Sequence, residues 1–335
     1  MLYNPVTLPA SKMFGTMTTL LNEIRNKETL APSEIINKMV DSARIGKVDF
    51  GKGIIYNFKL APQPNKNLTE VSSAMTITKA NVAQEIIPID DYKFVPLSYS
   101  EILGRDAFTN GTTIDAFFAF ISSLCEDTAQ FYLYDKVNGL YQDWVPGQAS
   151  QTIQINQIDT STLNGQALNE AKKWNATEIG KVVRKTINNM SIKNSKFTDI
   201  ATFNDINTGE QNNVVSCVKK SDLKMVFNDN YYTNFLADAM ASLYHADEVG
   251  QMLPGGEPVL VPTDAMKVGN EKVIGWLSDR DKFALADFYA VMLEWRDPST
   301  LYVNKFYHYA TGAGVFKYAP GVKFVENTIQ PGEEV

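Results

Sequence analysis

The chain has 335 residues, of which 44% are hydrophobic and 21% are charged, enough to bury a substantial core and to divide into two lobes. Its formal net charge of -7 argues against a strongly basic nucleic-acid-binding surface, although a local basic patch stays open. The two cysteines, Cys125 and Cys217, lie far apart without CxxC spacing, which favours buried free thiols over a disulfide.

The first residues contain no basic stretch followed by a continuous apolar stretch, so no ordinary secretory signal is visible. No window approaches the ~18 uninterrupted apolar residues of a membrane span. The sequence therefore predicts a soluble protein without a membrane partner.

Residues 1–50 are predicted to form an N-terminal arm of short helices. In 16–27, apolar residues recur at helical spacing, and Pro32 and Ser33 open a second helix. The apolar stripe of that second helix consists of Ile35, Ile36, Met39 and Val40. Two ordinary core helices would show the same pattern, so this alternative stays open.

Residues 51–97 show the period-two alternation of strands, in 54–60 and again from 85 to 95. The polar stretch 61–67 between them contains prolines, which exclude a central strand there. The pattern predicts a long, thin β-hairpin with few neighbours of its own, which would need a partner surface. Two strands of a compact sheet are the alternative. The candidate subunit contacts in this region are Tyr56, Phe58, Tyr92 and Phe94.

The most regular helical pattern follows, and it predicts one long helix over about 111–135 with Gly139 as its stop. Its stripe consists of Ile114, Phe117, Phe118, Ile121 and Leu124. Residues 148–169 are polar and suggest a connector or edge strand between lobes. A helix over 177–190 has a basic face, for which a solvated surface is favoured over nucleic-acid contact.

The rest of the chain is rich in strand signals. Strands are predicted at 214–218, with 223–227 as the segment after that strand, and at 258–262, 273–277, 290–295, 303–309 and 315–324, with a helix at 232–244. Gly312 and Gly314 would permit a bend or bulge between the last two strands.

No catalytic motif is present in the sequence. His245 and His308 belong to no HExxH pattern, and GxSxG, Walker A and dinucleotide-binding loops are missing. We therefore expect no catalytic residue, no cofactor and no metal site. A soluble enzyme with scattered acids around a cleft is the alternative of a different class.

The order of signals from Val214 onward resembles the major capsid proteins of tailed bacteriophages with the Hong Kong 97-type fold, particularly those of small short-tailed phages. The resembling segments are 214–226, 235–243, 258–262, 275–283 and 296–302. The resemblance implies an α+β fold with an N-arm, an extended β-hairpin loop, a spine helix and an outer α/β lobe. The implied division is an arm at 1–50, the extended loop at 51–97, a peripheral domain at 98–175, an axial domain at 176–294, and a return to the peripheral domain at 295–335.

The same resemblance implies a head protein that self-assembles through pentamers and hexamers into an icosahedral shell. The shell would enclose double-stranded DNA without sequence specificity in the virion, after assembly in the host bacterial cytoplasm. Scaffolding, portal and decoration proteins are further expected partners. Another head or tail component and an encapsulin-like compartment shell are the alternatives, because fold alone does not fix function. The last candidate subunit contacts are Arg296, Asp297, Tyr302, Phe306 and Tyr307.

Overall fold

The computed structural model describes residues 34–47, 54–60, 82–89, 91–100, 111–205, 209–229, 231–233, 259–261, 267–268 and 271–330. The first predicted arm helix, the hairpin apex at 61–67 and most of the predicted helix 232–244 lie outside these residues.

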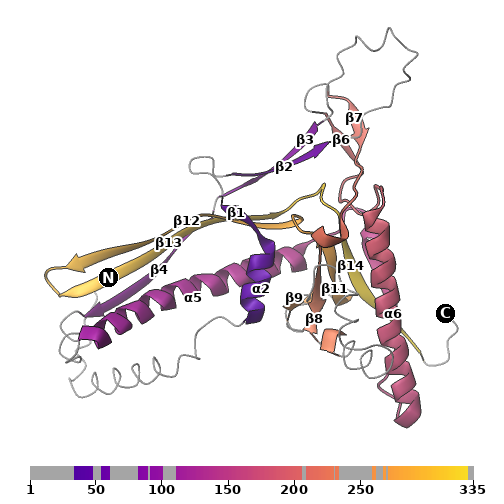
Figure 1. The fold of residues 1–335 in the computed structure, drawn as a ribbon, viewed down its shortest axis with the longest axis horizontal. Helices are drawn as coiled ribbons and strands as arrows, with labels where there is room; N and C mark the ends of the chain where they lie inside the picture. The colour runs from indigo at the N-terminus through magenta and orange to yellow at the C-terminus, as the bar shows by residue number, and fades with distance from the viewer. Residues whose placement is uncertain are drawn as a thin grey trace, which may run out of the picture.

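The described part of the chain forms two lobes that meet at an angle (Figure 1). In the long lobe, a four-stranded sheet of order β1-β12-β13-β4 lies beside helix α5. These elements are β1 (Arg44–Lys47), β12 (Phe283–Asp297), β13 (Tyr302–Val315), β4 (Asp91–Ser100) and α5 (Gly111–Asp143).

The second lobe is built on a six-stranded mixed sheet of order β5-β14-β11-β8-β9, with β10 paired to β11, and α6 packs on it. Its elements are β5 (Thr152–Ile158), α6 (Gly165–Ser191), β8 (Leu223–Asn228), β9 (Val259–Val261), β10 (Lys267–Val268), β11 (Glu271–Asp279) and β14 (Gly321–Ile329). The smaller elements are α2 (Glu34–Ala43), the hairpin strands β2 (Ile54–Leu60) and β3 (Val82–Pro88), β6 (Thr202–Asn204), β7 (Gln211–Asn213), η1 (Ala149–Gln151) and η2 (Lys220–Asp222).

Helix α5 is the predicted long helix, but it continues to Asp143 instead of stopping at Gly139. A glycine inside a helix costs only about 1 kcal/mol relative to alanine. The burial of Val137 and Tyr141 on either side of it, both fully inaccessible, is worth more than that, at about 1.5–3 kcal/mol per large apolar side chain. The burial of these two side chains therefore outweighs the cost of the glycine, and the helix continues past it.

Both faces of the six-stranded sheet are buried. On one face, Ile179, Val183 and Met190 of α6 pack with sheet residues in a single core cluster. On the other face, Val226 and Trp276 belong to the cluster that also holds α2 and α5. This apolar contact, in layers of helix, sheet and helix, joins the two lobes.

The strand pairings change three of the expected domain boundaries. Residues 91–100 join the long sheet beside β13 and do not extend the hairpin. The return to the long lobe begins at Phe283, because all of β12 pairs with β13. Strands β5 and β14, expected in the peripheral domain, pair with each other in the six-stranded sheet. The expected boundaries followed the order of signals, which carries no information on pairing between distant strands.

The described helix of the predicted arm and the predicted hairpin are both anchored within their own chain. In α2, the described helix of the predicted arm, Met39, Val40 and Ala43 are fully buried in the central cluster. The β2–β3 hairpin rests on its own subunit: both carboxylate oxygens of Glu85 accept the Lys317 backbone N–H, at 2.8 and 2.9 Å. The prediction of few neighbours was therefore wrong for strand β3.

Gly312 and Gly314 were expected to permit a bend, but strand β13 runs through both of them. A Cβ at Gly314 would lie 2.6 Å from the Ile87 side chain, and one at Gly312 would lie 2.7 Å from that of Ile89. These glycines let β3 and the residue after it cross closely over β13.

Candidate assembly interface

One face of the long sheet carries a row of exposed apolar side chains, which we call the open face. It consists of Tyr92 and Phe94 on β4, Val291, Leu293 and Trp295 on β12, and Phe306 and His308 on β13. Directly paired residues of neighbouring strands project to the same side of a sheet. The ring of Phe94 accordingly contacts the two rings of β13 on this face, with its centroid 6.1 Å from that of Phe306 and 5.5 Å from that of His308.

The large side chains of the open face are unusually accessible. Tyr92 is 60% exposed, Leu293 52% and Trp295 59%. Scattered exposed apolar residues are common on soluble proteins, but a contiguous apolar patch marks an interaction site. The open face is such a patch, because its members are register neighbours on three adjacent strands.

A register shift in β12 creates the patch on that strand. The pairing of β12 with β13 shifts between Asp287 and Tyr289, and one extra residue moves the following side chains to the other face. Before the shift Leu285 faces the core, whereas after it Leu293 and Trp295 face outward.

Helix α5 occupies the opposite face of the sheet and is fixed there by a polar cluster. Lys136 Nζ lies 2.6 Å from the Asp91 carboxylate, which also accepts the Tyr132 hydroxyl at 2.8 Å. Burial alone would raise the pKa of Asp91, but these two donors outweigh it and lower that pKa. The raised pKa of Tyr132, about 12, has burial as its main cause and the Asp91 carboxylate as a second one.

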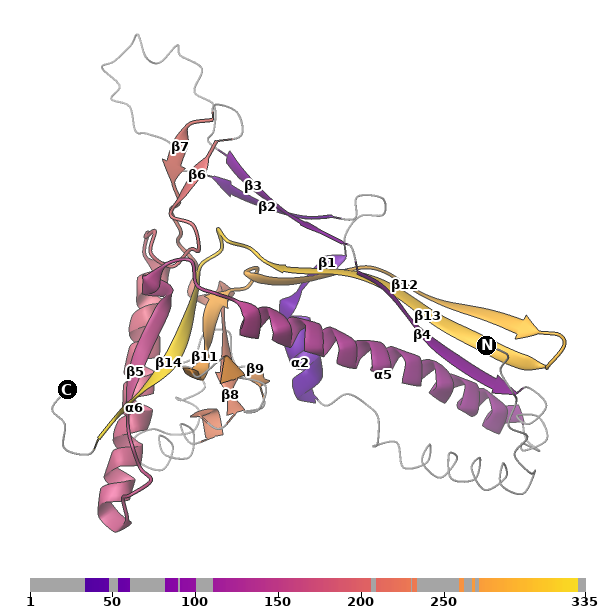
Figure 2. The ribbon, with the colours of Figure 1, turned by 180° about the vertical axis from the view of Figure 1, so that it is seen from behind.

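The hairpin of the same chain covers the base of this sheet face. Ala284 and Ala286 pack there with Phe316, and Ile87 of strand β3 packs against this cluster. The chain enters the sheet itself as β4 from Asp91, and the part of the face from Tyr92 outward has no cover among the described residues (Figure 2). The open face thus continues a surface that already accepts a hairpin.

The turn between β12 and β13 holds the far end of the open face in a fixed shape. The Asp297 carboxylate accepts the Ser299 N–H at 2.9 Å and the Thr300 hydroxyl at 2.8 Å. Hydrogen bonds from Ser299 and Thr300 lower the pKa of Asp297. Leu301 has a φ of 56°, a left-handed conformation that non-glycine residues rarely adopt.

The nine predicted contact residues fall into different places. Tyr92, Phe94 and Phe306 lie on the open face, and Tyr302 is exposed at its end. Tyr307 instead packs against the central cluster on the α5 side. Asp297 orders the turn, and Arg296 forms an exposed ion pair with Glu294 at 3.2 Å. Tyr56 and Phe58 lie on β2, paired with Ile86 and Gln84.

Sequence reasoning missed Val291, Leu293 and Trp295 as surface residues. Apolar residues occupy both odd- and even-numbered positions of β12 around the register shift, so the sequence of the strand resembles that of a strand buried on both faces. The shift itself has no marker in the sequence. The prediction of two buried free thiols is confirmed for Cys125. It was wrong for Cys217 in one respect, because that thiol is free but exposed.

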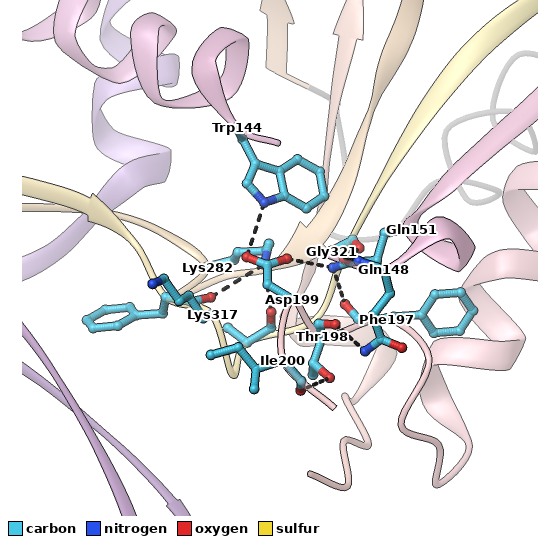
Figure 3. A network of polar contacts seen from close by, with 12 residues as sticks. Trp144, Gln148, Gln151, Phe197, Thr198, Asp199, Ile200, Lys282, Lys317 and Gly321 are labelled. Carbon is cyan, nitrogen blue, oxygen red and sulfur yellow. Dashed lines mark hydrogen bonds and ion pairs between the residues drawn. The ribbon is translucent and has the colours of Figure 1, made fainter. Parts of the chain in front are cut away.

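The junction of the two lobes is fixed by a buried polar network around Asp199 and Lys282 (Figure 3). Lys282 Nζ lies 3.0 Å from Asp199 Oδ1, and its side chain is completely inaccessible. Lys282 also donates to the Ala319 carbonyl at 2.9 Å. Burial lowers the pKa of Lys282, and the attraction of Asp199 only partly offsets this.

Asp199 collects donors from both lobes. It accepts the Trp144 indole N–H at 3.2 Å, just beyond the end of α5, and the Gln151 amide at 2.7 Å, from η1. The same Gln151 amide donates to the Phe197 and Gly321 carbonyls at 2.9 and 3.2 Å. Because each donor comes from a different segment, the network sets how α5 meets the six-stranded sheet.

Within the described ranges, no group of three or more His, Cys, Asp and Glu side chains is arranged to hold a metal ion. No helix in that part of the chain is long and apolar enough to cross a membrane. These residues form two packed lobes, one of which carries the exposed apolar open face.

Solved structures share this architecture. The chain is similar to the capsid structure of Staphylococcus phage Andhra at 11% identity and a TM-score of 0.57, over 90% of this chain and 87% of that one. It is also similar, at 9% identity and a TM-score of 0.58, to a chain in the structure of the head fibre and inner core protein gp22 of native bacteriophage P68, over 97% of this chain and 88% of that one. The capsid structure of Cyanophage P-SCSP1u matches at 8% identity and a TM-score of 0.53, over 86% and 88%. No curated protein sequence matches significantly.

The fold is therefore that of a tailed-phage capsid subunit, which confirms the predicted α+β, Hong Kong 97-type architecture. A family model for the Phi29-like phage major capsid protein matches residues 46–325. The chain belongs to this family, and its function is that of a major capsid protein, a structural component of the virion. The family match selects the capsid over the tail and compartment alternatives.

Proposed function

We propose that the open face is a contact surface between copies of this chain in the shell, and that the chain acts by assembly and not by catalysis. The observation that carries this is the contiguous exposure of Phe94, Leu293 and Trp295 on a sheet whose opposite face packs against α5. Burying one large apolar side chain stabilises a contact by about 1.5–3 kcal/mol.

The proposed shell partners follow from the family. The capsid encloses double-stranded phage DNA without sequence specificity, in agreement with a net charge of -7 that offers no strongly basic surface overall. Portal, scaffolding and decoration proteins complete the expected set, and assembly takes place in the cytoplasm of the host bacterium. The arm, hairpin, spine-helix and lobe assignments enter as parts of this proposal, with the boundaries that the strand pairings give.

The test is the double variant Leu293→Ser/Trp295→Ser. Both side chains point to solvent in the subunit, so the fold is expected to survive, with an unchanged circular-dichroism spectrum. Each contact loses the burial of two large apolar groups, about 3–6 kcal/mol. We expect negative-stain micrographs to show subunits or small rings in place of closed particles.

Val145→Ser provides the matched control, because Val145 is 81% exposed but lies outside the open face, just after α5. This variant is expected to assemble like the wild type. Closed particles of the double variant, in wild-type yield, would refute the role of the open face.

A further inference from the structure

Helix α6 and the residues just after it carry cations out of proportion to the rest of this acidic chain. The segment 172–196 contains seven of the 31 lysines and arginines of the chain but only one of its 38 acids, Glu178, which leaves 24 cations and 37 acids elsewhere. The seven cations are Lys172, Lys173, Lys181, Arg184, Lys185, Lys193 and Lys196. Such a local excess on a chain of net charge -7 marks a surface that attracts anions.

Four of these cations are displayed along the exposed side of the helix. We call this set the basic stripe, and it consists of Lys173, Lys181, Arg184 and Lys185. Spacings of three, four and eight residues place these side chains on one side of a helix. The opposite side of α6 is held in the core of the second lobe through Ile179, Val183 and Met190. Figures 1 and 2 both show α6 along the outer side of that lobe.

The basic stripe has almost no compensation within the subunit. Lys181 forms an exposed ion pair with Glu178 at 3.7 Å. Among the described residues, Lys173, Arg184 and Lys185 form no ion pair. The helix dipole does not account for the stripe either, because it favours cations in the last turn of a helix, and the last turn of α6 contains none. The stripe therefore has unused electrostatic attraction for a negatively charged partner.

The length and regularity of the stripe fit a double-stranded nucleic acid. From Lys173 to Lys185 the helix rises about 18 Å, at 1.5 Å per residue. Over that distance double-stranded DNA carries about ten negative charges, one per about 1.7 Å of its axis. Contacts between cations and phosphates position a protein on DNA without reading its sequence, and a shell that encloses DNA of any sequence requires contacts of this kind.

We infer that the basic stripe of α6 contacts the phosphate backbone of the double-stranded DNA inside the shell, so that this side of the second lobe faces the interior. The inference rests on the proposed function, in which the shell encloses DNA, and adds the surface of the subunit that the DNA touches. Exposed ionic contacts are individually weak. Repeated over many copies of the subunit on the same DNA, they reinforce one another.

The first test measures DNA binding by the unassembled subunit. The probe is a short fluorescein-labelled DNA duplex, and binding is followed by fluorescence anisotropy at several salt concentrations. The variant Lys181→Gln/Arg184→Gln/Lys185→Gln removes three cations of the stripe at exposed positions, so its circular-dichroism spectrum should be unchanged. The slope of the logarithm of the binding constant against the logarithm of the salt concentration should become shallower by about 0.9 per lost phosphate contact, or about 2.7 in all. Duplexes of unrelated sequence should give the same slopes.

The matched control removes the same charge from other elements. Lys38→Gln/Arg296→Gln/Lys317→Gln changes three exposed cations that lie off α6, and its salt slope should equal that of the wild type. An unchanged slope in the stripe variant would overturn the inference. An equal change in the stripe variant and in the control would do the same, because the effect would then belong to the net charge and not to the stripe.

The second test asks whether the stripe lies inside the shell. Cys217 is an exposed free thiol whose Sγ donates to the carbonyl of Ser191, the last residue of α6, at 3.1 Å, whereas Cys125 is buried. A maleimide attached to a large polyethylene glycol should label Cys217 in the unassembled subunit but not in closed particles, because so large a reagent does not cross the shell. Labelling of closed particles would place the end of α6 on the outer surface and overturn the inference.

The assembly of the stripe variant separates a DNA contact from a subunit contact. The variant is expected to form closed particles in wild-type yield, because the open face is unchanged in it. Loss of particles in this variant and not in the control would make the stripe a contact between subunits, which also overturns the inference. Failure of the wild type to form particles would instead count against the proposed assembly function, and the salt dependence of DNA binding by the subunit would still test the stripe.

Discussion

Replacing Lys282 by methionine tests whether the buried network fixes the lobe junction. The ammonium lies 3.0 Å from Asp199 in a site where the lysine side chain is inaccessible and that of the aspartate is 10% exposed. Methionine keeps the apolar stem, which passes so close to Gly321 that a Cβ there would clash with Lys282 Cδ. The variant therefore removes the charge and its hydrogen bonds while leaving the volume nearly unchanged.

The expected loss of unfolding free energy follows from the partners that remain. Breaking a buried ion pair by removing one member costs about 3–5 kcal/mol, because the other charge stays buried. Asp199 keeps two donors, Gln151 Nε2 at 2.7 Å and Trp144 Nε1 at 3.2 Å, which compensate part of its charge. We therefore expect a loss near the lower limit, about 3 kcal/mol.

The assay is urea unfolding of the unassembled subunit, followed by tryptophan fluorescence and by far-ultraviolet circular dichroism. Lys196→Met is the control, since Lys196 is exposed and has no ion pair among the described residues. In the double variant Lys282→Met/Asp199→Asn no buried charge is left, so its loss should be smaller than the sum of the single losses by at least about 1 kcal/mol. A Lys282→Met loss equal to that of the control, or strictly additive losses, would refute the reasoning.

Two further outcomes follow from the packing of the hairpin and of α2. Gly314→Ala should destabilise the subunit by about 1–3 kcal/mol through overpacking, because its Cβ would lie 2.6 Å from the Ile87 side chain. In a double-mutant cycle followed by thermal melting, adding Ile87→Ala should abolish the destabilisation by the added methyl group. An equal destabilisation with and without the Ile87→Ala change would contradict the close crossing of β3 over β13. Burial lowers the pKa of Lys224, whose ammonium donates to the Ser42 carbonyl of α2, to about 8. The unfolded chain retains this proton up to a pH of about 10.5, so the folded form binds fewer protons in between and stability should rise from pH 8 to pH 10. Lys224→Met should reduce this slope in urea midpoints, and an unchanged slope would count against the assignment.

The elements with one clear period were predicted well. Strands β9, β11 and β13 lie where their patterns placed them, and α5 begins at the predicted residue. The strand predicted at 214–218 was wrong, because among the described residues that segment forms only an isolated bridge between Ser216 and Asn194. Helix α6 was predicted from 177 but begins at Gly165, because its first turns bury only Ala171 and Ala176. A pattern of large apolar residues cannot predict a helical segment that buries only alanines, although the residues of this segment are good helix formers.

Long-range placement was the part that the sequence could not supply. Lys282 belongs to a polar run, Asp279-Arg-Asp-Lys, whose composition is typical of a surface turn, and the turn is there. Its last residue is nevertheless fully buried, because Asp199 approaches from a segment more than eighty residues away. Local polarity predicts exposure only while no distant partner compensates the charge.

The same limitation explains why the open face emerged only from the structure. Alternation in 85–95 placed Tyr92 and Phe94 in a strand. Their neighbours on β13 follow from a pairing across more than two hundred residues, and β12 is joined to that strand by a hairpin pairing. Those pairings show that the hairpin of the chain itself covers the base of the sheet and leaves the outer part uncovered. In a monomeric protein such exposure would be a liability, since apolar surface in water favours association. Under the proposed assembly function, the completion of the core depends on the neighbouring copy, and the hydrophobic stabilisation of the outer sheet is realised on assembly.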